Sequence, residues 1–299
     1  MTDLKIAVVG IPGKWSTEVL ADAIEAKTGF RLVIDIQQVV ADLNTPNVMY
    51  KDHSLCQLDG IIIKKISQVY SPTVIDRLEI LRFVEKCGVK IYSKPAEIIR
   101  LVDRMSCTIS LAKADIPMPP TMITENLEQA YKAVQKFGTV VLKPLFSTKA
   151  RGMLVLDDSM SEHELKNKLE QYYQQQGFFY IQQKLHLPGQ DMGLVFLNGE
   201  YKGAYARVGD GKSWNTTIHD GGKYAKAEPS EEIIEMARQA QAQFDLSYTT
   251  VDIAETEDGA VCFEVSAFGG FKGAKEGLGL DMATEYADFV IEQLRANKQ

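Results

Sequence analysis

The first third of the chain alternates short apolar segments with longer segments of helical periodicity. When a helix follows each strand, consecutive strands run parallel and the helices cover the faces of the sheet. The sequence therefore predicts a parallel β-sheet with helices packed on it. The predicted strands are residues 5–9, 31–36, 60–65 and 89–93, and the predicted helices are residues 16–27 and 72–88.

The turn after the first predicted strand, GIPGKWS, resembles a phosphate-binding loop because it contains two glycines and a lysine. The full pattern requires a further glycine five positions before the Gly-Lys pair, where the chain has Val8. We therefore interpret Gly10 and Gly13 as turn residues.

The character of the sequence changes near Lys94. Residues 93–121 predict one long helical run that ends in a proline-rich extended segment. Further along, helices mix with strands, and Asn198-Gly199 is typical of the two-residue turn of an antiparallel hairpin. We expect an α/β lobe up to about residue 94, followed by an α+β part that contains antiparallel strands.

The composition excludes several classes of partner. A net charge of -7 gives no general attraction to nucleic acid or to anionic lipid. No segment approaches the roughly 18 apolar residues of a membrane helix, and the N-terminus MTDLKIAVVG indicates a strand instead of a signal peptide. Cys56, Cys87, Cys107 and Cys262 are dispersed without metal-binding spacing, which is typical of reduced thiols. We therefore expect a cytoplasmic protein without nucleic-acid or membrane partners.

Two carboxylates, Asp252 and Glu264, stand in otherwise apolar segments around an acidic turn. A three-residue turn at 257–259, with glycine in the left-handed position, places Asp252 directly opposite Glu264 on a hairpin. The same register puts Phe263 on the apolar face and Cys262 beside the carboxylates. Like charges at roughly 5 Å repel by up to about 1 kcal/mol unless a cation lies between them. One interpretation is a Mg²⁺ site, and the other is an exposed acidic face of a hairpin.

Basic residues of the second part of the chain indicate anion binding. Lys143 lies in the apolar strand VVLKPL, where an isolated ammonium needs an anion, although a side chain that reaches solvent at the strand end is the alternative. The next loop, FSTKARG, carries Lys149 and Arg151 and is suited to cover phosphates. Arg207 and Asn215 belong to a later glycine-bearing loop, a context in which polar residues are commonly functional.

The order of these features resembles the ATP-grasp superfamily: a strand lysine, a basic glycine loop, the segment YIQQKL, an aspartate, an arginine loop, and a hairpin with two carboxylates. Within it, the chain is most similar to the RimK-like ligases, over nearly its full length and with few gaps from about Lys94 onward. The motif FGGFKGAK is also similar to the ATP-grasp enzymes of the GAK system. The resemblance implies an ATP-grasp fold, with a Rossmann-like N-terminal lobe at residues 1–94 and two α+β lobes, at residues 95–183 and 184–299, that enclose the nucleotide.

The resemblance also implies ATP and Mg²⁺ as cofactors, together with a set of site residues. Arg207 is implied as the catalytic residue near the reacting phosphoryl or acyl group. The implied nucleotide-binding residues are Arg104, Lys143, Lys149, Arg151, the hinge residues Gln182, Gln183, Lys184 and Leu185, Asp191 near the ribose, Asn215 and Thr217. The implied metal ligands are Asp252, Glu264 and Ser266.

Four positions depart from the family pattern. Ser266 replaces the asparagine that usually provides the third metal ligand, and its shorter hydroxyl is a weaker ligand. Arg104 stands in place of a phosphate-binding lysine, which is a change of cation. Ala150 replaces a loop glycine and Thr217 replaces an asparagine. These departures concern catalysis more than nucleotide binding.

The function implied by the resemblance is an ATP-dependent carboxylate–amine ligase. ATP phosphorylates a carboxylate, an amine attacks the acyl phosphate, and an amide, ADP and phosphate are released. The alternatives are a catalytically weakened ATP-binding protein and an ATP-grasp kinase that acts on a hydroxyl. The expected substrates are a carboxylate and an amine, as small molecules or peptides, and the sequence leaves a homo-oligomer open.

Overall fold

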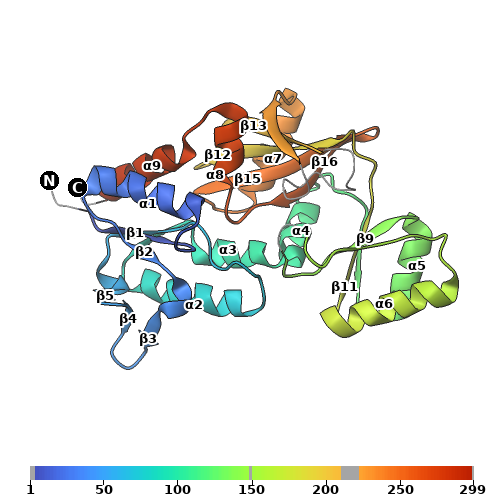
Figure 1. Ribbon diagram of the computed structural model, residues 1–299, viewed down its shortest axis with the longest axis horizontal. Coiled ribbons are helices and arrows are strands. Elements are labelled where there is room, and N and C mark those ends of the chain that lie inside the picture. Colours follow the sequence, from blue (N-terminus) through green and yellow to red (C-terminus); the bar gives the residue numbers. More distant parts are fainter. Residues whose placement is uncertain (1–3, 148–149, 210–221, 298–299) are drawn as a thin grey trace.

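The computed structural model describes residues 4–147, 150–209 and 222–297, and its three larger sheets define three lobes (Figure 1). The N-terminal lobe contains a four-stranded parallel sheet in the order β2-β1-β6-β7. This sheet confirms the prediction from the alternating pattern. Its strands are β1 (Ile6–Val9), β2 (Val33–Ile34), β6 (Gly60–Ile63) and β7 (Lys90–Tyr92), and its long helices are α1 (Trp15–Thr28) and α2 (Thr73–Lys86).

The same lobe carries a small antiparallel sheet that the alternating pattern does not predict. Its three strands follow one another along the chain, so each pairs with its neighbour. They are β3 (Val40–Asp42), β4 (Asn47–Tyr50) and β5 (His53–Ser54), flanked by the 3-10 helices η1 (Ile36–Gln38) and η2 (Leu55–Gln57).

The turn between β1 and α1 is closed by side chains of α1. Gly13 has a positive φ of 76°, and its N–H donates to Glu18 Oε1 at 2.6 Å. The Ile11 N–H donates to Thr17 Oγ1 at 3.2 Å. Because a carboxylate stands at the N–H groups where a phosphate would bind, the turn is not a phosphate loop. The interpretation of Gly10 and Gly13 as turn residues is confirmed.

The helical run after Lys94 consists of two helices, so the prediction of one long helix is wrong. Helix α3 (Pro95–Val102) ends at Asp103, which has an extended conformation, and α4 (Arg104–Lys113) begins directly after it. The first N–H groups of a helix have no partner within the helix, and the Asp103 carboxylate accepts the Met105 N–H at 3.0 Å. This cap fixes Arg104 as the first residue of α4.

The central lobe is an antiparallel sheet with two helices packed on it (Figure 1). Both helices begin at polar caps, because the side chains of Asn126 and Ser161 accept N–H groups of the first turn. In the order β10-β9-β11-β8, the sheet contains β8 (Thr121–Thr124), β9 (Val140–Leu142), β10 (Leu154–Leu156) and β11 (Phe179–Gln183), and the helices are α5 (Leu127–Phe137) and α6 (Glu162–Gln176).

The C-terminal lobe is built on a five-stranded antiparallel sheet in the order β14-β13-β12-β15-β16. Asn198 and Gly199 form the turn between β12 and β13 with φ angles of 50° and 78°, which confirms the predicted hairpin. The strands are β12 (Gln190–Leu197), β13 (Glu200–Val208), β14 (Lys223–Ala227), β15 (Tyr248–Thr256) and β16 (Gly259–Val265), and the helices are α7 (Glu231–Ala242), α8 (Phe271–Leu278) and α9 (Met282–Ala296).

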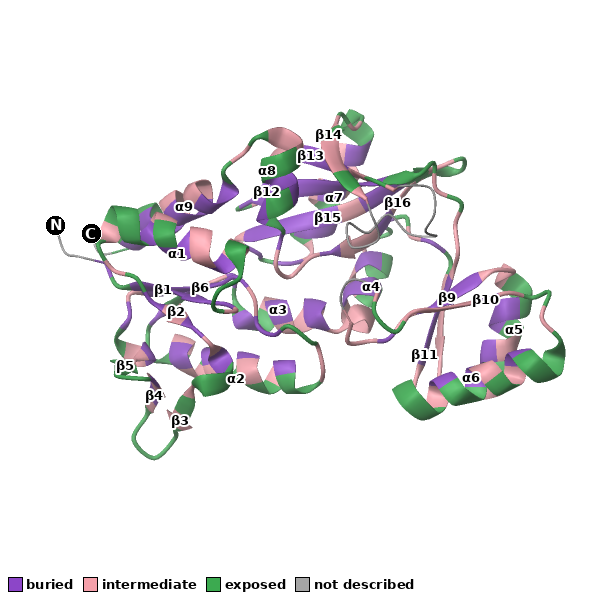
Figure 2. Ribbon diagram, in the orientation of Figure 1, coloured by how far each residue is buried: buried purple, intermediate pink, exposed green. Residues whose placement is uncertain are grey.

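The N-terminal and C-terminal lobes share their hydrophobic cores, whereas the central lobe has a core of its own (Figure 2). Ile61 of β6 and Val251 of β15 belong to one cluster, and Leu20 of α1 joins Val290 of α9 in another. Leu111 of α4 also belongs to the shared core. The two outer lobes therefore form one packed body. The lobe boundaries after residues 94 and 183 stay predictions.

Helix α8 lies close to the sheet of the C-terminal lobe because its sequence provides glycines at the contact. A Cβ on Gly273 would lie 2.4 Å from the Tyr205 ring, and a Cβ on Gly277 would lie 2.7 Å from the Tyr205 side chain. Tyr205 is buried between these glycines and β12. Two glycines at helical spacing in and after the FGGFKGAK motif thus serve packing, while the exposed Lys275 lies over the Trp15 ring at 5.3 Å.

Candidate functional site

Strands β15 and β16 pair with Asp252 opposite Glu264, which confirms the predicted carboxylate pair. The connecting turn contains two residues, 257–258, so the prediction of a three-residue turn is wrong. The shorter turn shifts the register by one residue, and a β-bulge at Phe263 shifts it back before Glu264. The turn and the bulge together place Asp252 directly opposite Glu264.

The bulge also changes which side chains enter the site. Side chains alternate between the two faces of a strand, so one extra residue reverses the alternation beyond it. Cys262 pairs with Ile253 and is buried in the shared core, so its predicted place beside the carboxylates is wrong. The predicted place of Phe263 on the apolar face is also wrong, because its ring lies 5.4 Å from Lys143 Nζ. An aromatic ring therefore joins the site.

Arg207 connects two carboxylates of neighbouring strands. Its Nε donates to both carboxylate oxygens of Asp191 at 3.1 Å, and its Nη2 lies 3.0 Å from Asp252 Oδ2. Asp191 and Arg207 are directly opposed on β12 and β13, while Gly193 of β12 opposes Asp252. Three residues predicted for different roles are thus in contact with one another. The expected contact of Asp191 with a ribose stays a prediction.

The Asp252 carboxylate has the properties of a cation ligand. Burial raises its pKa to about 6, and the charges of Asp191 and Glu264 act in the same direction against the attraction of Arg207. Its Oδ1 is buried and has no hydrogen-bond partner among the residues that the structure describes. A buried carboxylate oxygen without a partner is unfavourable, and a bound cation removes this deficit.

Asp252 and Glu264 together fit Mg²⁺. Within residues 4–147, 150–209 and 222–297, no three His, Cys, Asp or Glu side chains are grouped in a way that could hold a metal, so the candidate ligands among these residues are the two carboxylates. Mg²⁺ is commonly held by one or two carboxylates, with water and substrate phosphates in the other positions. Ser266 follows β16 directly, and its N–H donates to the Thr250 carbonyl at 2.8 Å. A role of the Ser266 hydroxyl in metal binding stays a prediction.

Arg104 brings positive charge from α4 to Glu264 of the carboxylate pair. Its Nη1 lies 3.8 Å from Glu264 Oε2. Its Nε donates to the Pro144 carbonyl at 3.2 Å and its Nη2 to Ser147 Oγ at 3.3 Å, both in the loop after β9. Arg104, at the capped start of α4, therefore connects the loop after β9 to β16. Its expected contact with a phosphate stays a prediction.

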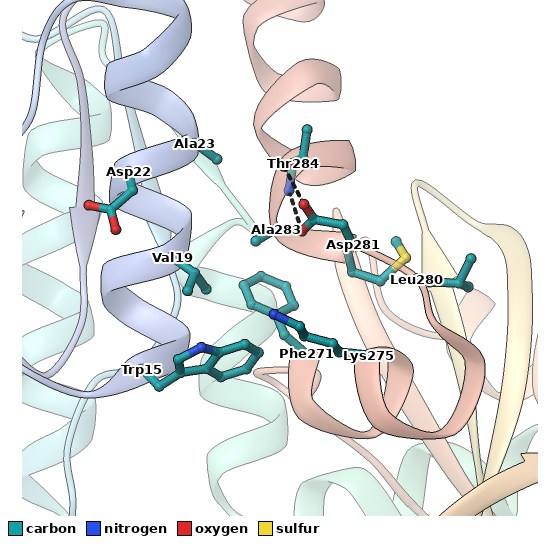
Figure 3. Close-up of a pocket in the computed structure, with 11 residues that line it drawn as sticks. Trp15, Val19, Asp22, Ala23, Phe271, Lys275, Leu280, Asp281, Ala283 and Thr284 are labelled. Carbon is teal, nitrogen blue, oxygen red and sulfur yellow. Dashed lines mark hydrogen bonds between the residues drawn. The ribbon is translucent and has the colours of Figure 1, made fainter.

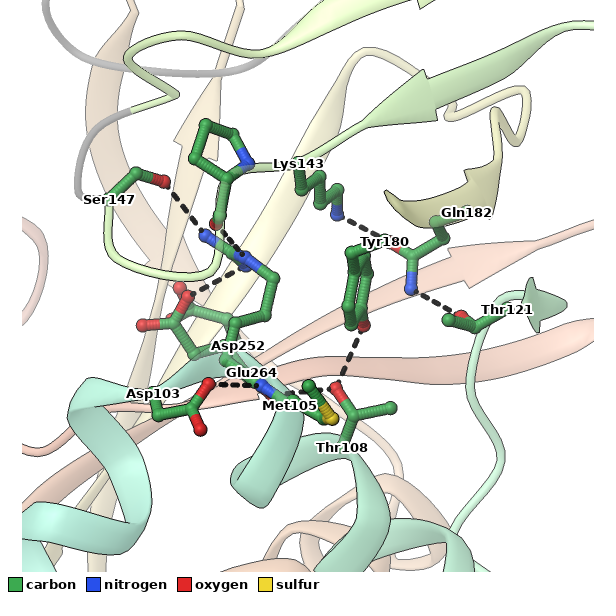
Figure 4. A network of polar contacts seen from close by, with 12 residues as sticks. Asp103, Met105, Thr108, Thr121, Lys143, Ser147, Tyr180, Gln182, Asp252 and Glu264 are labelled. Carbon is green, nitrogen blue, oxygen red and sulfur yellow. Dashed lines mark hydrogen bonds and ion pairs between the residues drawn. The ribbon is translucent and has the colours of Figure 1, made fainter. Parts of the chain in front are cut away.

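Lys143 approaches the site from the central lobe. Its ammonium donates to Gln182 Oε1, and Gln182 Nε2 donates to Thr121 Oγ1 at 3.0 Å (Figure 4). Burial lowers the pKa of Lys143 to about 7, with a further decrease from Arg104 and a smaller opposing effect of Glu264. An ammonium that contacts an amide oxygen in a buried position is stabilised by an added anion. This environment is suited to a phosphate group.

The predicted hinge, Gln182, Gln183, Lys184 and Leu185, lies at the end of β11 where the chain leaves the central lobe. The Gln183 N–H donates to the Pro120 carbonyl at 2.8 Å, and the Lys184 N–H donates to the Thr139 carbonyl at 2.9 Å. These bonds hold the segment against the ends of two other strands. Its contact with adenine stays a prediction.

The loop after β9 reaches the N-terminal lobe. Arg151 Nη1 donates to the Gln68 carbonyl at 3.4 Å. Ala150 has a positive φ of 57°, a conformation in which glycine is unstrained, so the replacement of the family glycine introduces strain at this turn. Three residues predicted for nucleotide binding, Lys149, Asn215 and Thr217, lie outside the described residues.

The N-terminal lobe adds residues that the sequence analysis missed. Lys65 Nζ donates to the Tyr70 hydroxyl at 2.9 Å, and Tyr70 meets the Phe268 ring edge-on at 6.5 Å. Burial raises the pKa of Tyr70, and the charge of Glu264 raises it further. A signal for this contribution was present in the sequence, because Lys64 and Lys65 follow an apolar parallel strand at its carboxyl end, where such sheets bind ligands.

A pocket of about 250 Å³ lies elsewhere, between α1 and the start of α9 (Figure 3). Trp15, Phe271, Lys275 and Asp281 are among its lining residues. In the described part of the chain, none of the predicted nucleotide or metal residues lines it. The candidate chemistry is therefore concentrated at the junction of the three lobes.

Two α+β lobes that bring a half-buried lysine to the hairpin of a carboxylate pair, next to a parallel N-terminal lobe, are the arrangement of an ATP-grasp protein. Residues 102–290 match the RimK-like ATP-grasp domain, which is more than half of the chain. The protein belongs to this family.

Relatives of known name are similar over most of their length. The tetrahydromethanopterin:alpha-L-glutamate ligase of Methanosarcina acetivorans is 26% identical over 85% of this chain and 83% of its own. A probable alpha-L-glutamate ligase of Trichodesmium erythraeum is 24% identical over 97% of both chains. Among solved structures, the ATP-grasp ligase PsnB in complex with a precursor variant, Mg and ADP has a TM-score of 0.75 at 18% identity, with 98% of this chain and 99% of that chain covered. The RimK domain protein of Sphaerobacter thermophilus has a TM-score of 0.74 at 20% identity, with 95% and 98% covered.

These comparisons confirm the predicted ATP-grasp fold and the ligase class. The GAK system, a cytoplasmic location and a homo-oligomer stay predictions. Among the described residues, no helix is both long enough and apolar enough to span a membrane.

Proposed function

We propose that the protein is an ATP-dependent carboxylate–amine ligase that joins an acyl donor to the amino group of glutamate or a similar amino acid. The observation that carries the proposal is the Asp252–Glu264 pair, with Arg207 in contact with Asp252 and Lys143 beside Phe263 of the same hairpin. Membership of the RimK-like family supports the ligase chemistry. The glutamate ligases among the relatives support glutamate as the amine.

The charges of the site match the needs of phosphoryl transfer. Lys143 and Arg104 bind the phosphates of ATP from the side of the central lobe and α4. Asp252 and Glu264 would hold Mg²⁺, which would supply positive charge for the transferring phosphoryl group. Burial lowers the pKa of Arg207, but Asp252 and Asp191 raise it well above the ordinary value. Arg207 therefore remains cationic throughout and stabilises negative charge that develops on the reacting oxygens.

The reaction has two balanced steps. In the first, a carboxylate oxygen of the acyl donor attacks the γ-phosphorus of ATP, and the bond to the leaving ADP oxygen breaks. In the second, the neutral amine attacks the acyl carbon, phosphate leaves with the bonding electrons, and the amine loses a proton. Asp191 holds Arg207 in position during both steps through the bidentate contact.

Hydroxylamine trapping tests the ligase chemistry. The protein is incubated with Mg-ATP, hydroxylamine and pooled carboxylic acids, and hydroxamate is measured together with ADP. Formation of both in equal amounts supports an acyl phosphate and identifies the acid. ADP release with phosphorylation of a hydroxyl compound would instead indicate a kinase. Nucleotide binding without ADP release from any pool would indicate a weakened ATP-binding protein.

Replacement of hydroxylamine by amino acids tests the amine. L-glutamate should give an amide product with the acid identified by trapping, at a higher rate than L-glutamine or L-alanine. Equal rates with all three amino acids would contradict selection of glutamate while leaving the ligase chemistry intact.

A further inference from the structure

Lys64 is a buried lysine at the carboxyl end of β6 that the proposed chemistry does not use. Its backbone N–H donates to the Val9 carbonyl at 2.8 Å, which extends the pairing of β1 and β6 by one residue. Its ammonium donates to the Gly269 carbonyl at 2.5 Å, across 205 positions of the chain. Lys64 is 5% exposed. The N-terminal lobe is thus hydrogen-bonded to the segment that follows β16.

The surroundings of the Lys64 ammonium are aromatic. The Phe271 ring lies 4.1 Å from Nζ and the Tyr248 ring 5.8 Å. Within residues 4–147, 150–209 and 222–297, no carboxylate forms an ion pair with Lys64. Burial lowers the pKa of Lys64 to about 7, and the neighbouring Lys65 lowers it further. An apolar side chain of this size avoids the desolvation of a charge, so stability alone gives no reason for a lysine here.

The acceptor of this bond lies in a short segment, residues 266–270, between the carboxylate strand and α8. The segment is tied at its start, where the Ser266 N–H donates to the Thr250 carbonyl at 2.8 Å. At Gly269 an added Cβ would lie 2.6 Å from the Tyr248 ring, so the backbone lies directly on that ring. The bond from Lys64 ties the end of the segment. Both ends are therefore fixed to different parts of the fold.

Lys65 also contacts this segment. Its ammonium lies 5.3 Å from the Phe268 ring and donates to the Tyr70 hydroxyl at 2.9 Å. The position of Tyr70 near Glu264 therefore depends on how segment 266–270 sits on the N-terminal lobe. Lys64 and Lys65 directly follow the last residue of β6, so one end of this strand provides both lysines that contact the segment.

We propose that Lys64 is a positioning residue of the ligase reaction, which fixes segment 266–270 on the N-terminal lobe and so aligns Tyr70 and Phe268 with Glu264 around the acyl donor. This inference rests on the proposed function, because it assigns the acyl donor to the space between the N-terminal lobe and the carboxylate strand. The residues proposed to bind ATP do not include Lys64, so nucleotide binding and acyl transfer should respond differently to the loss of its ammonium.

Lys64→Met tests the inference, because methionine keeps the apolar stem and removes the donor. We expect amide hydrogen exchange in segment 266–270 to become at least tenfold faster. The KM for ATP should stay within threefold, whereas kcat/KM for the acid in the hydroxamate assay should fall at least tenfold. Lys64→Arg keeps a charged donor and should recover part of this loss. Lys90→Met, at an exposed position of β7 in the same sheet, should leave all three quantities unchanged.

Two results would overturn the inference: unchanged exchange in segment 266–270, or parallel losses for ATP and acid that follow a general loss of stability in urea unfolding. A wild-type protein that forms no hydroxamate with any acid overturns the proposed function instead. In that case the exchange measurement still decides whether Lys64 holds the segment.

Discussion

The Lys143→Met variant should be more stable than the wild type without nucleotide and should lose the stabilization by Mg-ATP. Burial lowers the pKa of Lys143 from 10.5 to about 7, so the folded protein disfavours the charged lysine. At about 1.4 kcal/mol per pKa unit, this shift corresponds to at most about 5 kcal/mol. Because the Lys143 side chain is partly exposed, we expect the free energy of unfolding of Lys143→Met to exceed that of the wild type by about 1–2 kcal/mol at neutral pH.

The pH dependence of this gain has a definite sign. The pKa of Lys143 is lower in the folded than in the unfolded state, so the unfolded chain binds more protons between pH 7 and 10.5. The free energy of unfolding of the wild type therefore rises with pH across this window through Lys143. The advantage of Lys143→Met should be largest below about pH 7 and should disappear near pH 10.

Mg-ATP should reverse the order of stability. A ligand at 100 times its dissociation constant stabilises the wild type by about 2.7 kcal/mol, and the variant lacks the lysine that we propose to face the phosphates. Urea unfolding with and without Mg-ATP measures both effects. Lys132→Met, at an exposed position of α5, is the matched control, and its free energy of unfolding should stay within about 0.5 kcal/mol of the wild-type value. A Lys143→Met variant that is less stable without nucleotide yet keeps the Mg-ATP gain would refute the placement of Lys143 at the phosphates.

Four further variants address the candidate metal site and the packing of α8. Glu264→Gln should retain the fold and weaken nucleotide binding in Mg²⁺ titrations, because it removes an anionic ligand; intact binding with increased stability would instead indicate a repulsive surface pair. Gly273→Ala should cost about 1–3 kcal/mol in urea unfolding, since its Cβ would lie 2.4 Å from the Tyr205 ring. The control Gly270→Ala, whose added Cβ has no heavy atom within 4 Å, should lower the free energy of unfolding by less than about 1 kcal/mol. Equal losses of stability at both glycines would contradict the packing account. Ser266→Asn should leave steady-state ADP release unchanged or raise it, because the longer amide oxygen reaches the metal directly; a silent wild type beside an active variant counts against the ligase.

The pairing of Asp252 with Glu264 was predictable although the details of the hairpin were not. Alternation of apolar residues requires a register that puts both carboxylates on one face, and that requirement is met. The prediction met this requirement with a three-residue turn. The protein instead meets it with a two-residue turn and a bulge at Phe263. Cys262 is small and apolar, so it fits the core as well as the opposite face, and its identity contains no signal for the bulge.

Contacts between distant segments were beyond sequence reasoning. Asp191, Arg207 and Asp252 were each predicted as site residues from their order in the chain, but their mutual contacts arise from the strand order β13-β12-β15. Order along the chain does not specify which strands become neighbours. In the same way, no local pattern predicts that Lys64 meets a carbonyl 205 positions away.

Because the central lobe has a separate core, its stability is expected to depend on ATP binding. A lobe with its own small core can open while the larger body stays folded, so the two behave as different cooperative units. Lys143 and Gln182 belong to the smaller unit, whereas Asp252 and Glu264 belong to the larger one. A nucleotide held between them ties the units together, and its binding free energy adds to the stability of the weaker one. The resistance of the central lobe to proteolysis is therefore expected to rise and fall with the concentration of ATP.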